Sequence, residues 1–164
     1  MKAIYALEGG VAGAAAITLI HESIKRVVPQ APRMDLLGMN ALSKGIKLVG
    51  ARTPSERKLY AASLTGDLLS NAIFYSFAGI GKRENALIRG AVLGLTAGLG
   101  AVLLPKPMGL NPKHSNRTVE TQIMTVSLYV IGGIVAAGVM KLLDKKKKRK
   151  EEKWEERLVT SSMA

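Results

Sequence analysis

Eight polar residues in or beside apolar stretches are the ones whose types could do chemistry. They are His21, Glu22, Ser63, Asp67, Asn71, Gln122, Thr125 and Tyr129. Ser63, Asp67 and Asn71 follow one another at four-residue steps, which places them on one face of a helix. The last three of the eight form a second stripe of the same kind. A carboxylate and an imidazole among hydroxyls and amides could hold a proton, an ion or a small polar group.

If the apolar segments alternate in direction across a membrane, all eight side chains fall in the same half of it. Ionisable residues inside a membrane are costly and often functional, so one interpretation is a water-accessible site for an ion, a proton or a polar headgroup. A simpler interpretation is that these side chains only form hydrogen bonds that fix helix packing. A third is an enzyme that uses His21 as its base.

Several kinds of chemistry have no residues to carry them. The chain has no cysteine, which excludes disulfides, cysteine zinc sites and thiol catalysis. Its two histidines, His21 and His114, lack a second ligand three or four residues away, the spacing that metal sites on helices use. There is also no phosphate-binding loop and no nucleophile elbow. We therefore expect no metal, no cofactor and no enzymatic activity.

The composition is typical of helices packed closely in lipid. Of the 164 residues, 48% are hydrophobic but only 4% are aromatic, and 17 residues are glycine. Small side chains must therefore fill most helix contacts. The stretch 121–140 holds no charge, and at 1.5 Å per residue it would cross roughly 30 Å of hydrocarbon. These features predict an all-α, polytopic membrane protein.

Four apolar segments bounded by charges and prolines predict four transmembrane helices. They cover about 3–27, 59–81, 86–104 and 120–143, and form one four-helix domain over 1–143. The second should begin at the capping signal Thr53-Pro54-Ser55-Glu56. Its insertion is marginal, because its apolar residues contribute roughly −2 to −4 kcal/mol and Asp67 costs roughly 2.5 to 3.5 kcal/mol. We expect a neighbouring helix to shield Asp67.

Residues 34–49 are predicted to form an amphipathic helix. Leu36, Met39 and Leu42 begin an apolar series at three- and four-residue steps, while lysines occupy another face. Such a helix could lie in the membrane interface or pack on the protein's own helices. The pattern is compatible with both.

Glycines in three of the apolar segments are predicted to let neighbouring helices approach closely. They are Gly9, Gly13, Gly90, Gly94, Gly98, Gly132 and Gly133. Residues this small at four-residue spacing form a smooth groove on one face of a helix.

The charges are gathered at the ends of the apolar segments and in a mixed-charge tail over 144–164. The net charge is +12, and the tail opens with six consecutive cations, Lys145, Lys146, Lys147, Lys148, Arg149 and Lys150. We expect these cations to contact anionic lipid headgroups. A nucleic-acid tail would need interleaved aromatic residues, and this tail has only Trp154. The cations favour a cytoplasmic tail in a bacterial-type inner or plasma membrane, although the basic 21–58 connection opposes that orientation.

The function expected from these features is that of a small, non-enzymatic integral membrane protein, an accessory or structural subunit. The alternative is a transporter- or channel-like protein whose polar cluster is a site for a proton, an ion or a small polar solute. The expected partners are the lipid bilayer with its anionic headgroups, and a protein partner or a second copy of the chain, but not nucleic acid.

Overall fold

The computed structural model describes the backbone of residues 1–162 and most side chains, except those of 148, 150, 152 and 155–162. Its elements are α1 (Ala3–Ile24), α2 (Met34–Leu48), α3 (Glu56–Ser76), η1 (Phe77–Gly79), η2 (Arg83–Asn85), α4 (Ala86–Leu103), α5 (Lys113–Asn116) and α6 (Val119–Ser162). The described part of the chain is entirely helical, so the predicted all-α class is confirmed.

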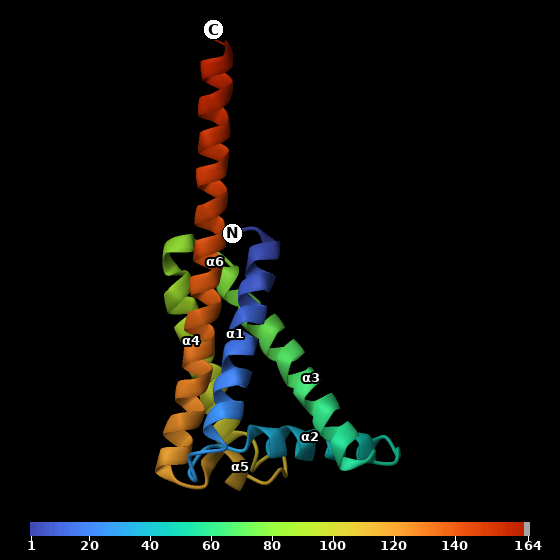
Figure 1. Cartoon of the computed structure of the whole chain (residues 1–164). Coiled ribbons are helices and arrows are strands. Elements are labelled where there is room, and N and C mark those ends of the chain that lie inside the picture. The colour runs from blue at the N-terminus through green and yellow to red at the C-terminus, as the bar shows by residue number, and fades with distance from the viewer. Residues whose placement is uncertain (163–164) are drawn as a thin grey trace.

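Helix α6 lies at the centre of the bundle, with α1 and α4 on two sides of it (Figure 1). Gly9 of α1 lies against Ala136 of α6, and the later Gly13 lies against the earlier Gly132. Helix α4 meets α6 in the same sense, from the Gly90–Gly133 contact to Gly98 against Val126. Both helices are therefore antiparallel to α6 and parallel to each other. Helix α3 packs on α1.

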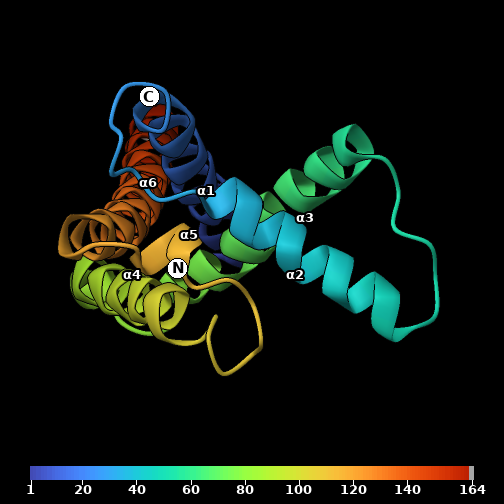
Figure 2. The same cartoon turned by 90° about the horizontal axis from the view of Figure 1, so that it is seen from below.

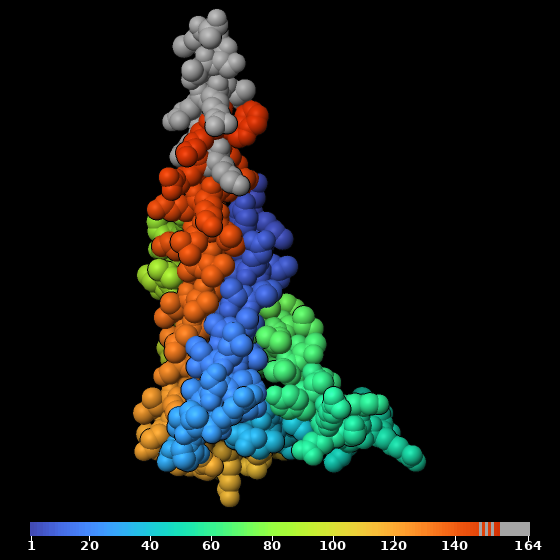
Figure 3. Space-filling view, viewed as in Figure 1, coloured from blue at the N-terminus to red at the C-terminus, as the bar shows by residue number. Residues whose placement is uncertain are grey.

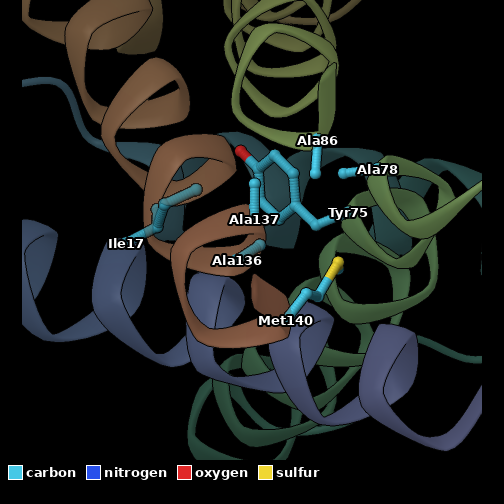
Figure 4. Close-up of a cluster of buried hydrophobic side chains, with 7 residues drawn as sticks. All are labelled: Ile17, Tyr75, Ala78, Ala86, Ala136, Ala137 and Met140. Carbon is cyan, nitrogen blue, oxygen red and sulfur yellow. The ribbon is translucent and has the colours of Figure 1, made fainter. Parts of the chain in front are cut away.

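The packing reverses the pattern of a soluble protein, because small residues are buried and large apolar ones face outward. Seven of the fourteen buried hydrophobic residues in the described part of the chain are alanines, and large apolar side chains are exposed along all four long helices. Tyr75 and Met140 are the two large side chains at the centre, among Ile17 and four alanines (Figure 4). An outer surface this apolar is suited to lipid.

Three helices in the described part of the chain are long and apolar enough to cross a membrane: Ala3–Ile24, Arg83–Leu103 and Val119–Lys147. They correspond to three of the four predicted spans. The fourth, 59–81, does not meet the same criterion, because Asp67, Asn71 and three serines lower the mean hydropathy of α3. The helix also begins after Ser55, with no side-chain cap bond, rather than at the expected Thr53.

Helix α3 diverges from the bundle as it approaches α2, and α2 lies across the lower end of the molecule (Figures 1 and 2). The space-filling view shows the two helices projecting from the foot of a narrow column (Figure 3). Leu37 of α2 is buried, and Gly38 lies against the Ser63 hydroxyl of α3. Leu48 and Val49, at the far end of α2, are 77% and 80% exposed. The predicted amphipathic helix therefore packs on its own protein at one end and is free at the other.

Candidate functional site

An open cleft of about 660 Å³ lies where α3 diverges from α4 above α2. Its apolar lining consists of Met34, Leu37, Gly38, Ala41, Phe74, Ala97, Gly100, Ala101, Leu104, Pro105, Met108 and Leu110. Figure 2 shows α2 and α3 extending away from α4, with the chain that leads to α5 on the same side. The backbone carbonyl of Met108 accepts a bond from Lys44 Nζ at 2.6 Å, which ties this loop to α2.

The polar part of the cleft consists of Asp67, Ser70, Asn71, Thr96 and Tyr129. Asp67 and Asn71 share a face because they are four residues apart on α3, and Asn71 Nδ2 donates to Asp67 Oδ1 at 3.1 Å. Ser70 Oγ donates to the carbonyl of Asp67, and Thr96 Oγ1 donates to the carbonyl of Val92. These two hydroxyl protons are therefore used within their own helices, so the groups offer mainly acceptor lone pairs to the cleft.

A smaller cavity of about 30 Å³ adjoins the cleft, and Asp67, Tyr129 and Met34 line both spaces. Its other lining residues are Ile17, Thr18, His21, Glu22, Asp35, Tyr60, Ser63, Leu64 and Leu128. The hydroxyl oxygen of Thr18 is buried and has no hydrogen-bond partner among the described residues. The cavity is large enough for one ordered water, and Thr18 would supply one of that water's partners.

His21 is buried between α1 and the segment that leads into α2. Its Nε2 lies 3.0 Å from the carbonyl oxygen of Pro32 and 3.2 Å from the backbone nitrogen of Met34. The ring donates to Pro32 in one tautomer and accepts from Met34 in the other. Because Nε2 is engaged with the backbone in either case, the histidine anchors this connection.

A network of charges joins the lower ends of α1 and α2. Lys25 Nζ donates to Glu22 and, at 3.1 Å, to Asp35, which also pairs with Arg33 at 3.0 Å. Burial alone would raise the pKa of Asp35, but the hydrogen bonds from Arg33 and Lys25 outweigh it and lower the pKa to about 2. The ammonium of Lys25 also lies 5.4 Å from the centre of the Tyr60 ring on α3. Asp35 therefore stays ionised at neutral pH, and the network connects α1, α2 and α3.

Six of the eight polar residues singled out from the sequence meet in the structure. His21, Glu22, Ser63, Asp67 and Tyr129 line the small cavity, and Asn71 is bonded to Asp67 in the cleft.

The other two polar residues, Gln122 and Thr125, line neither space. The segment containing α5 packs on that face of α6, and Thr125 Oγ1 lies 2.9 Å from the carbonyl of Ser115. The second predicted stripe is therefore divided between the cavity and a loop contact.

Sequence reasoning missed two kinds of residue at this site. Thr96 lines the cleft beside the glycine face of α4, and its isolated polarity in an apolar segment was the available signal. Thr18 had the same signal in the first segment. Gly10, which packs against the backbone of Ala72, was also missed between the two predicted packing glycines of α1.

The predicted packing glycines and basic residues lie at helix contacts and at the start of the tail. A β-carbon on any of the seven glycines would collide with the neighbouring helix. Of the cations, Lys145, Lys146 and Arg149 are exposed, and Lys147 pairs with Glu151 at 3.0 Å. The side chains of Lys148 and Lys150 lie outside the described ones.

Among the described residues, no group of three or more histidine, cysteine or acidic side chains could hold a metal ion. No protein-family model, curated protein or solved structure matches this chain.

Proposed function

We propose that this chain is a small, non-enzymatic integral membrane protein of the accessory or structural class, with four crossings and a binding site open to the lipid phase. One observation carries the proposal. A bundle closed by glycine and alanine contacts holds open a cleft that is apolar over most of its lining and polar at Asp67 and Asn71.

The direction of the helices supports a fourth crossing. Helices α1 and α4 run the same way along α6, so a chain that spans the membrane in both must return across it between them. Helix α3 is the long helix in that interval. Asp67, which makes its insertion marginal, faces Asn71, Tyr129 and the small cavity rather than lipid alone.

The one-sided position of the polar groups favours a binding site over a channel. The cleft and the small cavity both lie toward the α2 end of the bundle. Toward the other end, the core around Tyr75 and Met140 is fully buried and lined by alanines. A pore would need polar or hydrated surface on both sides of this core.

We place the C-terminal tail on the cytoplasmic face of a bacterial-type inner or plasma membrane. Arg83 Nε pairs with Asp144 at 3.3 Å, so the α3–α4 turn and the start of the tail lie at the same level. The cations of the tail would meet anionic headgroups there. A partner protein or a second copy would pack on the exposed apolar faces.

Single-cysteine labelling tests this topology cleanly, because the chain has no cysteine of its own. Ala51→Cys and Asn111→Cys should react with a membrane-impermeant thiol reagent from one side, and Glu84→Cys from the other. Labelling of Ala51→Cys and Glu84→Cys from the same side would exclude a crossing by α3. Resistance to alkaline extraction tests membrane integration separately.

A transporter-like role for a proton, an ion or a small polar solute is the second candidate. The small cavity supports it, because Glu22, His21 and Asp67 line a space of about 30 Å³ together with the unpartnered Thr18 hydroxyl. Under this alternative, Ser63→Cys should react with the impermeant reagent. Under the accessory role it should remain unlabelled.

A further inference from the structure

We propose that the cleft between α2, α3 and α4 binds one amphiphile dissolved in the membrane, with a protonated amine paired to Asp67 and an apolar body along α4. This inference rests on the proposed placement of the protein in a membrane. It adds the chemical class of the ligand, which the proposed function leaves open.

The size of the cleft suits a single small molecule. Its volume of about 660 Å³ falls within the roughly 300–1,000 Å³ typical of ligand sites. One turn of a helix, about 5.4 Å long and 10–12 Å across with its side chains, already occupies roughly 400–600 Å³. The cleft therefore holds less than two turns, which argues against a transmembrane helix of a partner as its occupant.

The charge of the lining selects the head of the ligand. Asp67 is the only charged residue among those that line the cleft, and no described cation lies within ion-pair distance of it. Its Oδ1 accepts the bond from Asn71, which leaves Oδ2 available. A ligand with a carboxylate head would be repelled by Asp67. A ligand with a neutral head would leave Asp67 without a countercharge in the low-dielectric membrane interior, where an unpaired charge is costly.

The hydrogen-bonding character of the lining points the same way. The hydroxyls of Ser70 and Thr96 give their protons to backbone carbonyls and keep their lone pairs free. The amide oxygen of Asn71 is a further acceptor. An ammonium group carries three donors and no acceptor, so it matches this set of acceptors. A hydroxyl offers one donor and no charge.

The residues that line the cleft indicate how the ligand enters it. Met34, Leu37 and Ala41 of α2 close the cleft at the end nearest the aqueous side, together with the loop around Met108. Helices α3 and α4 diverge from their shared turn (Figure 1), and residues of both helices line the open cleft. In the proposed placement this opening faces the lipid. The ligand therefore enters sideways, with its amine leading to Asp67 and its alkyl part along Ala97, Ala101 and Leu104.

Three straight-chain probes with the same number of carbon atoms test the proposal on the full-length protein in a non-ionic detergent. They are dodecylamine, dodecanol and dodecanoate, and the readout is the thermal unfolding midpoint at neutral pH. Dodecylamine at a hundredfold excess over its Kd should raise the midpoint by roughly 5–10 °C. Dodecanol should have a smaller effect and dodecanoate none. Equal shifts with the amine and the alcohol would overturn the proposal.

Two pairs of variants separate binding in the cleft from adsorption to the protein–detergent particle. Asp67→Asn should weaken dodecylamine binding roughly tenfold or more, whereas the matched loss of an exposed acid in Glu84→Gln should not. Ala101→Phe should fill the cleft and abolish the shift, whereas Leu99→Phe, on the exposed face of α4, should retain it. If Ala101→Phe does not fold, Gly100→Leu takes its place. Amine selectivity that persists in Asp67→Asn would refute the role of the carboxylate.

The two proposals fail in different ways. A protein released by alkaline extraction would contradict membrane integration whatever the probes do. A protein that stays in the membrane but does not distinguish dodecylamine from dodecanol would contradict only the ligand class.

Discussion

Gly90 of α4 and Gly133 of α6 bring their backbones into direct contact. A β-carbon on either residue would overlap the carbonyl oxygen of the other. This line of close backbone contact between α4 and α6, which we call the seam, continues at Gly94. Gly94 lies against the backbone of Tyr129 and Val130. The position of Tyr129, and with it the wall shared by the cleft and the small cavity, therefore depends on how closely these two helices approach.

The seam predicts a sharp difference between two glycines of the same helix. Gly133→Leu should destabilise the protein by about 3 kcal/mol or more, because a side chain would have to displace the α4 backbone. Gly138→Leu should have little effect, since a β-carbon there meets no described atom within 4 Å. Thermal unfolding and the amount of protein in the membrane fraction measure both. Equal losses in the two variants would mean that general helix propensity, not the seam, controls stability.

Asp67 should reduce the stability of its own helix in the membrane. The Asp67→Asn variant keeps the shape of the side chain and removes a charge that costs roughly 2.5–3.5 kcal/mol at the centre of a membrane helix. Without ligand, it should accumulate in the membrane as well as the wild type or better, and unfold at the same or a higher temperature. Failure to accumulate would show that the charge is needed for assembly. Asp67→Leu, which also removes the partner of Asn71, should be less stable than Asp67→Asn.

His21 should matter for stability through the backbone that it satisfies. His21→Ala removes the side chain beside the Pro32 carbonyl and the Met34 amide, and leaving buried backbone groups unpaired costs about 1–3 kcal/mol. His114→Ala is the control, because the His114 side chain forms no hydrogen bond within the described part of the chain. Proteolysis within residues 25–33 should speed up in the first variant only. An unchanged cleavage rate would contradict the anchoring role.

The low pKa of Asp35 predicts that the protein loses stability in acid. Its folded pKa of about 2 lies below its ordinary value of 3.8, so its contribution is present above pH 4 and is lost as the pH falls toward 2. The loss should be about 1–2 kcal/mol, allowing for solvent screening of a partly exposed group. Unfolding midpoints between pH 7 and pH 2.5 should show this decline in the wild type. In Asp35→Asn the decline should be smaller; an identical profile would mean that Asp35 does not contribute.

The sequence predicted the helices and their close contacts well, because both depend on local patterns. Apolar length and charge-free stretches mark the spans of α1, α4 and α6, and glycine spacing marks the faces that meet. Six of the eight polar residues lie together, since four-residue spacing and alternating direction are enough to bring Asp67, Asn71 and His21 to one end; their role as a site stays a prediction.

What the sequence could not predict depends on contacts between distant segments. Thr125 left the cluster because the segment with α5 packs over it, and nothing local indicates where that connection lies. The open cleft is lined by α2, α3, α4 and the loop after α4, and the Lys44–Met108 hydrogen bond ties that loop to α2. The capping signal at Thr53 was misleading because the helix begins after the next favourable cap, Ser55.

Helix α6 is unbroken from Val119 to Ser162 over 44 residues, which at 1.5 Å per residue is roughly 66 Å. A bilayer core takes up roughly 30 Å of that length. In the proposed placement, the remaining roughly 36 Å of helix extends beyond the bilayer core. Any protein that recognises the far end of the tail would be held at that height. Adding or removing four residues beyond Asp144 would change this distance by roughly 6 Å and rotate the recognised face by roughly 40°.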